Sequence, residues 1–180
     1  MLLLQGLRQL CHFDERGFLF FDASRKGFWR SFAAAFWCLP IWALAQYIQL
    51  QGLAEDKAEH FLMVQAVAFV IAWLAYPLLM VRLADVFGVW PNYYRYMVAY
   101  NWFRTVLQFI WLPLLLLELV PQAQADGMIT LFFLVVQGVE LTYDWFLARR
   151  GLGVPSGTAF AFALIDCLLG YLIDQTAAAL

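Results

Sequence analysis

The chain has 180 residues, of which 64% are hydrophobic and 13% are charged, and its formal net charge is −2. Soluble domains are about half apolar and about a quarter charged, and a chain of this size cannot bury so large an apolar excess in its own core. The composition therefore excludes an ordinary soluble domain. The absence of a long basic run also argues against a nucleic-acid partner. We expect the lipid bilayer to be the main partner of the chain.

Five apolar stretches are long enough to cross a bilayer core of ~30 Å, which takes about 20 helical residues. None of them alternates with the period of two that a transmembrane β-strand would show, so helices are predicted. The expected fold is an all-α, polytopic membrane helix bundle within residues 29–180, preceded by a segment at residues 1–28 that does not cross. The predicted spans are Ser31–Leu50, Phe61–Val81, Met97–Leu119, Met128–Leu147 and Gly157–Ile173.

Basic residues alternate along the chain in a way that sets an orientation. Nine of the eleven Lys and Arg residues fall before the first span, in the second connection or in the fourth. The first and third connections, Gln51–His60 and Val120–Gly127, contain only Lys57. Since positive residues are retained on the cytoplasmic side, the N-terminus should be cytoplasmic and the C-terminus outside. The use of nine Arg against two Lys favours a GC-rich bacterial source, and hence a bacterial inner membrane.

The first residues of the chain have the pattern of a short amphipathic helix that lies in the membrane interface. An equally good interpretation is that this segment packs across the cytoplasmic mouth of the bundle. Further along, Asp22 and Ser24 are both candidate caps for the first spanning helix. The apolar residues that recur at helical spacing are Leu2, Leu3, Leu4, Leu7, Leu10 and Cys11.

Several aromatic residues cluster where a bilayer interface is expected. Amphipathic rings favour the depth of the lipid headgroups, so we expect these residues to form an aromatic belt without any ligand. They are Trp29, Trp90, Tyr93, Tyr94 and Tyr96.

Spans three and four carry matched polar residues at membrane depth, where a charged group costs ~2.5–3.5 kcal/mol on insertion scales. Each set has the spacing i, i+3, i+7, which places its members on one helix face. Arg104 lies nine residues from Arg95, and Glu140 lies nine from Arg149, so both should sit roughly 13 Å deep at ~1.5 Å per residue. Antiparallel packing then predicts three contacts, which are Asn101 with Asp144, Arg104 with Glu140, and Gln108 with Gln137.

Two interpretations of this polar cluster are open. Polar side chains commonly form hydrogen bonds between membrane helices, so the cluster can have the structural role of holding the helices together. Alternatively, Arg104 balances one carboxylate, while Glu140, Asp144 and Asp166 supply three. At least one acid would then be protonated, solvated or bound to a cation, which suits the movement of protons, cations or a small polar solute. We expect Asp144 to be shallow enough to be wet, and Asp166 to be the acid without a partner.

The sequence offers little for catalysis or for a cofactor. The two histidines, His12 and His60, should lie on opposite sides of the membrane, which leaves no paired-histidine metal site. Cys11, Cys38 and Cys167 are far apart, form no CxxC pair and suggest neither a disulfide nor a metal site. Because GxSxG motifs and glycine-rich phosphate loops are also lacking, we expect no catalytic residue, no cofactor and no enzymatic activity.

The order of elements is similar to that of the Yip1-domain superfamily of membrane proteins. The resemblance rests on five spans after a cytoplasmic N-terminal segment and on the polar-aromatic entrance of the third span, Arg95-Tyr-Met-Val-Ala-Tyr-Asn-Trp102. The aspartate-leucine-tyrosine-glycine type of motif at the N-terminus of that family has only a distant echo in Phe21-Asp22-Ala23-Ser24, so no functional residue is carried over. The resemblance implies a non-enzymatic protein of membrane organisation or trafficking, or a bacterial relative.

The leading functional expectation is a non-catalytic membrane scaffold or accessory subunit that binds another membrane protein or itself. The alternative, which follows from the polar cluster, is a small transporter or channel component. A water-filled cavity that reaches Glu140 or Asp166 would favour transport. A dry, paired cluster with an apolar groove elsewhere would favour the scaffold.

Overall fold

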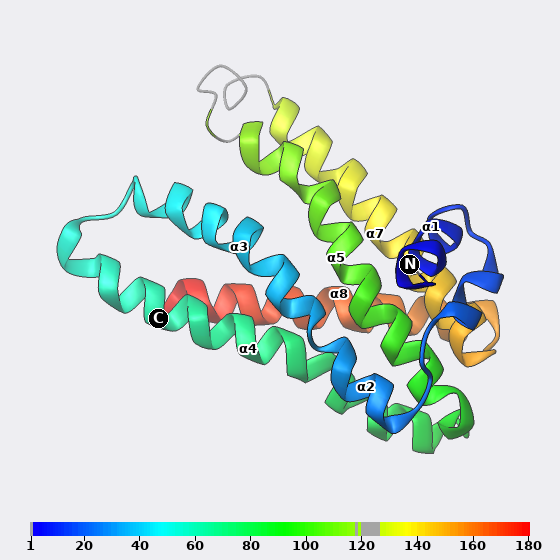
Figure 1. The fold of residues 1–180 in the computed structure, drawn as a ribbon. Helices are drawn as coiled ribbons and strands as arrows, with labels where there is room; N and C mark the ends of the chain where they lie inside the picture. The colour runs from blue at the N-terminus through cyan, green and yellow to red at the C-terminus, as the bar shows by residue number, and fades with distance from the viewer. Residues whose placement is uncertain (1, 118, 120–126) are drawn as a thin grey trace.

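The computed structural model describes residues 2–117, 119 and 127–180 (Figure 1). These residues form α-helices and two short 3-10 turns, with no β-strand among them, so the all-α prediction is confirmed. The turns are η1 (Glu15–Phe20) and η2 (Trp90–Asn92). The helices are α1 (Leu2–Cys11), α2 (Arg25–Ser31), α3 (Ala34–Leu50), α4 (Glu55–Val86), α5 (Tyr93–Leu117), α7 (Met128–Leu152) and α8 (Ser156–Ala179).

Four helical stretches within the described residues are long and apolar enough to cross a membrane. They coincide with the first, second, fourth and fifth predicted spans, and the first of them combines α2 and α3. They are Arg25–Leu50, Glu55–Val86, Ile129–Leu152 and Ser156–Ala179.

The third predicted span corresponds to α5, which is 25 residues long but falls outside this apolar set. Its lower hydropathy comes from polar residues such as Asn101, Arg104 and Gln108. The helix can carry them because it is the innermost one, with α2, α3 and α7 packed around it. The end of this predicted span and most of the expected connection Val120–Gly127 lie outside the described residues.

The first of these four stretches begins at a capped helix N-terminus. The backbone N–H of Gly27 donates to the hydroxyl of Ser24 at 3.0 Å, so of the two candidate caps Ser24 is confirmed. Asp22 instead accepts a hydrogen bond from the backbone N–H of Ser24 at 3.1 Å. Hydrogen bonds from the side chain and the backbone of Ser24 hold the pKa of the exposed Asp22 carboxyl below its ordinary value.

The helix ends gather at two opposite ends of the bundle, and one of them carries nine basic residues and is called the basic end below. At this end the side-chain amide of Asn92 donates to the carbonyl of Leu152 at 2.9 Å, which joins the α4–α5 and α7–α8 connections. The N-terminal segment joins them through a 3.2 Å ion pair between Arg150 and Glu15. At the other end, a ring nitrogen of His60 lies 2.9 Å from the carbonyl oxygen of the terminal Leu180.

The N-terminal segment packs against the basic end. Helix α1 and η1 approach so closely that a Cβ on Gly6 or Gly17 would lie 3.0 Å or 2.8 Å from the carbonyl oxygen of the other glycine. The hydroxyl of Tyr143 on α7 donates to the carbonyl of Cys11 at 2.8 Å, and the ring of Phe13 stacks on the Tyr143 ring at 4.6 Å. The outer side of the segment exposes Leu2, Leu4 and Leu19, as an interfacial helix would.

The buried core fills the basic half of the bundle. Helices α4 and α7 contribute their C-terminal parts, beginning at Tyr76 and Phe146. Helix α5 contributes its N-terminal part, ending at Leu107, and α8 contributes Ala159 and Phe162. Toward the other end, Figure 1 shows α5 and α7 running away from α3, α4 and α8. Large apolar side chains are exposed along that half of α4, α7 and α8. In a membrane, lipid or another protein segment would cover them.

Gly27 gives a direct test of the packing at the start of the first span. A Cβ at this position would collide with the carbonyl oxygen of Asp22, whereas a Cβ at Gly138 in α7 would meet nothing within 4 Å. We expect Gly27→Ala to lower the free energy of unfolding by about 1–3 kcal/mol, and Gly138→Ala to raise it by about 0.5–1 kcal/mol. Unfolding by SDS in mixed micelles measures both changes. Equal effects of the two substitutions would contradict the close approach at Gly27.

Candidate functional site

A three-residue polar network links α5 to α8 inside the bundle. The guanidinium of Arg104 donates to the hydroxyl of Tyr100 at 2.6 Å, one helical turn away on α5. That hydroxyl donates in turn to the carboxylate of Asp166 on α8 at 2.7 Å. The other carboxylate oxygen of Asp166 lies 3.9 Å from Arg104. Helix α8 packs mainly on α7 and α4, so the long side chains of α5 reach across the interior to meet it.

Two further tyrosines extend this network toward α4. The hydroxyls of Tyr76 and Tyr96 lie 2.8 Å apart, and both rings are almost fully buried. The ring centroids of Tyr76 and Tyr100 are 4.9 Å apart. Arg104 also lies over the ring of Trp73 on α4, 5.7 Å from its centroid. The guanidinium also lies 5.5 Å from the centroid of the Tyr100 ring. The cation is thus held by one carboxylate, one hydroxyl and two aromatic faces from three helices.

The predicted ion pair between Arg104 and Glu140 is wrong. Glu140 instead accepts hydrogen bonds from the indole of Trp111 at 3.3 Å and from the side-chain amide of Gln137 at 3.4 Å. Depth matching alone placed Arg104 opposite Glu140. In the structure the hydroxyl of Tyr100, one turn nearer the basic end, accepts a hydrogen bond from the guanidinium, which is directed toward α8. Asp166, expected to lack a partner, is therefore the acid that Arg104 neutralises.

The two flanking contacts predicted between α5 and α7 are also not formed. Asn101 donates to the hydroxyl of Ser31 at 2.8 Å and so ties α5 to α2, away from Asp144. Gln137 donates toward the sulfur of Cys167 at 3.5 Å as well as to Glu140, while Gln108 is half-buried. Asn101 and Gln137 thus have partners on α2 and α8, two helices outside the predicted pair of spans.

Asp144 is buried in this structure, with 5% of its surface exposed, which corrects the expectation that it would be wet. Its position one helical turn from Glu140 places two acids on neighbouring turns of α7. Neither an ion pair nor a hydrogen bond to the Asp144 carboxylate occurs among the residues that the structure describes. Like Glu140, it has no ion-pair partner among the described residues, and unlike Glu140 it also lacks a hydrogen-bond donor there.

Sequence reasoning missed the tyrosines as part of the site. Tyr93 and Tyr96 were assigned to an aromatic belt, yet both are buried, and Tyr93 donates to the carbonyl of Pro77 at 2.9 Å. Trp29 and Trp90 are exposed, as the belt requires. The signal that was available is the spacing of Tyr100 and Arg104, because residues four apart on a helix are neighbours.

The described residues include no group of three or more His, Cys, Asp or Glu side chains placed to hold a metal ion. Burial raises the pKa of the Cys11 thiol, which makes it a weaker nucleophile at neutral pH than an exposed thiol. The polar network itself consists of a fixed cation, a carboxylate and hydroxyl groups that bond to one another. This arrangement can join helices or hold a proton, and it presents no activated nucleophile.

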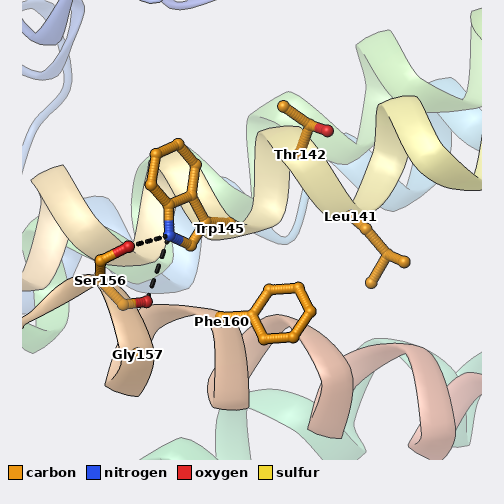
Figure 2. Close-up of a pocket in the computed structure, with 6 residues that line it drawn as sticks. All are labelled: Leu141, Thr142, Trp145, Ser156, Gly157 and Phe160. Carbon is orange, nitrogen blue, oxygen red and sulfur yellow. Dashed lines mark hydrogen bonds between the residues drawn. The ribbon is translucent and has the colours of Figure 1, made fainter.

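A second feature is a groove on the surface between α7 and α8, with a volume of about 430 Å³. Figure 2 shows the indole N–H of Trp145 directed at Ser156, where it donates to the hydroxyl at 3.1 Å and to the carbonyl at 3.2 Å. None of the residues of the polar network lines this groove. Its lining residues are Leu141, Thr142, Trp145, Ser156, Gly157 and Phe160.

Comparison with known proteins gives no relative for this chain: no protein-family model matches it, nor does any curated protein or solved structure.

The hydroxyl of Tyr100 should matter more to stability than that of an exposed tyrosine. Tyr100→Phe removes the bridge between Arg104 and Asp166 and leaves two partly buried charged groups short of a hydrogen bond, which we expect to lower the free energy of unfolding by ~1–3 kcal/mol. Tyr171→Phe on α8 is the matched control, because that side chain is exposed. Unfolding in mixed micelles reports both. A loss of similar size in the two variants would contradict the role of the Tyr100 bridge.

Proposed function

We propose that this protein is a non-catalytic integral membrane scaffold or accessory subunit that binds another membrane protein or a second copy of itself. In this proposal five helices span the membrane, with the N-terminus in the cytoplasm and the C-terminus outside, in a bacterial inner membrane. The gathering of nine basic residues at one end of the bundle supports this orientation, because cytoplasmic ends retain positive charge. The Yip1-domain resemblance would imply the same kind of role in membrane organisation.

In this proposal helix α5 crosses the membrane as the third span, in addition to the four apolar stretches. Its 25 residues reach roughly 37 Å at ~1.5 Å per residue, which exceeds the ~30 Å apolar core of a bilayer. Arg104 need not face lipid, because Tyr100, Asp166 and Trp73 surround its guanidinium. A central helix of a bundle can be less apolar than its neighbours for this reason.

The observation that carries the proposal is the half-buried carboxylate of Glu140 at the midpoint of α7. Its hydrogen-bond partners among the described residues, Trp111 and Gln137, are neutral, and the guanidinium of Arg104 is paired with Asp166. A partly exposed acid at mid-membrane is costly, by ~2.5–3.5 kcal/mol on insertion scales, unless protein or water covers it. A helix from another protein, or from a second copy, that donates a hydrogen bond to Glu140 would remove that cost.

The neighbourhood of Glu140 has the composition of a helix-binding surface. The ring of Trp111 on α5 lies against that of Phe133 on α7, with centroids 5.4 Å apart, and Phe133 is exposed. Gln137 lies between Phe133 and Glu140 on the same side of α7 and is half-buried. Polar groups among apolar ones are what joins helices in lipid. We call Trp111, Phe133, Gln137 and Glu140 the Glu140 face.

Site-specific photocrosslinking in native membranes tests this surface. The photoreactive residue p-benzoylphenylalanine is placed at Phe133 on the Glu140 face, or at Tyr171 on α8 as an exposed aromatic control. We expect a discrete protein adduct from Phe133, either with a partner or with a second copy, and far less from Tyr171. Adding Glu140→Gln should reduce the Phe133 adduct about tenfold, which corresponds to ~1.4 kcal/mol of binding.

Two outcomes would contradict the proposal. One is the absence of any protein adduct from Phe133 in a chain that unfolds like the wild type. The other is an adduct of equal yield from Phe133 and Tyr171, since this would mean that the Glu140 face is no more occupied than the rest of the surface.

One observation supports transport as a second candidate function, namely that Asp144 is buried without a cation among the described residues. Such an acid can take up and release a proton if water reaches it. The candidate requires proton flux through the wild-type protein in liposomes and its loss in Asp144→Asn. Wild-type flux no greater than that of empty liposomes would dismiss it.

A further inference from the structure

The scaffold proposal assigns no role to the surface groove between α7 and α8. We propose that it binds one anionic phospholipid, with Arg149 at the headgroup and an acyl chain along Leu141 and Phe160. The inference rests on the membrane embedding proposed above but not on the Glu140 face, which lies further toward the opposite end of α7. The proposed phospholipid site is thus separate from the protein-binding surface proposed above.

The order of side chains along α7 follows the order of groups in a phospholipid. Arg149 lies one turn nearer the basic end than Trp145, and its guanidinium is 5.3 Å from the centroid of the Trp145 ring. Leu141 lies one turn on the other side of Trp145, toward the middle of the helix. A cation, an amphipathic ring and an apolar side chain thus succeed one another with depth. Headgroup, interface and acyl chain do the same in a lipid leaflet.

Arg149 is available to form an ion pair with an anion. Its neighbour Arg150 is paired with Glu15 of the N-terminal segment at 3.2 Å. Among the residues that the structure describes, Arg149 forms no ion pair and no side-chain hydrogen bond, and its guanidinium lies over the face of the Trp145 indole. An arginine fork fits a phosphate oxygen pair well, since it can donate two parallel hydrogen bonds.

The start of α8 adds donors on the other side of the groove. Ser156 and Gly157 are the first residues of α8 and both line the groove, and no side chain caps this helix. The first intrahelical bond runs from the N–H of Ala159 to the carbonyl of Pro155, so the N–H groups before Ala159 lack intrahelical partners. Together with the positive end of the helix dipole, these groups reinforce the attraction that Arg149 exerts on an anion.

The indole of Trp145 holds the two sides of the groove together. Its N–H donates to both oxygens of Ser156, which fixes the start of α8 against α7 (Figure 2). Figure 2 also shows Leu141 and Phe160 on the deeper side of this contact, facing the same space from the two helices. Exposed apolar residues continue along α8 beyond Phe160, at Leu164 and Leu168, and provide a path for an acyl chain. The groove is therefore polar and cationic at one end and apolar at the other.

Native mass spectrometry of the purified protein in detergent tests the site. Dioleoyl phosphatidylglycerol and dioleoyl phosphatidylcholine, which differ only in the headgroup, are added in turn at equal concentration. We expect the wild type to retain one phosphatidylglycerol about tenfold more than one phosphatidylcholine. Arg149→Gln should reduce this preference to about twofold or less. Arg82→Gln, which removes an exposed arginine at the same end of the bundle, is the matched control and should leave the preference unchanged.

Other outcomes would overturn the inference. Equal retention of the two lipids by the wild type would mean that no anionic headgroup is recognised, and equal losses in Arg149→Gln and Arg82→Gln would mean that general charge attracts the lipid. If the wild type retains inorganic phosphate and neither lipid, the site would be assigned to free phosphate. Circular dichroism of each variant shows that its helices are intact. Failure here would leave the crosslinking at Phe133 unaffected, so the two proposals fail separately.

Discussion

The arginine at the centre of α5 is the constraint on which the rest of the bundle depends. An arginine cannot be neutralised by losing its proton, so Arg104 must find a counter-charge wherever the fold places it. It finds Asp166, which is 62 positions further along the chain, through the hydroxyl of Tyr100. This contact sets the register of α8 relative to α5. The two helices need not pack side by side, because the arginine and tyrosine side chains are long enough to span the interior between them.

Two consequences follow from placing this network in the basic half of the bundle. The helices there close around it, with tyrosine rings from α4 and α5 packed into a continuous core that the N-terminal segment extends. Toward the other end the helices diverge, and Glu140 is left half-buried beside neutral donors. The bundle therefore meets its surroundings in two different ways. In the proposed membrane embedding, the Glu140 face suits a polar contact with another helix at mid-membrane, whereas the groove at Trp145 suits a charged headgroup near the surface.

Much of the helical fold could be predicted from the sequence, because an apolar run of about 20 residues is long enough to form a helix that crosses a bilayer. Four of the five expected spans coincide with helices apolar enough to cross, and the fifth, α5, is a helix whose polar residues lower its hydropathy. The site was harder to predict. The residues Arg104, Glu140 and Asp166 were identified as polar groups at similar depth, but depth alone does not determine which helix a long side chain will reach. That choice depended on Tyr100, which was not counted among the polar residues at membrane depth.

A double-mutant cycle on Arg104 tests the central claim most directly. The free energy of unfolding in mixed micelles is measured for Arg104→Gln, Asp166→Asn and Glu140→Gln, and for Arg104→Gln combined with each acid variant. The account predicts a coupling energy on the order of 1 kcal/mol between Arg104 and Asp166, reduced by the partial exposure of the arginine, and less than about 0.5 kcal/mol between Arg104 and Glu140. A larger coupling with Glu140 than with Asp166 would contradict it.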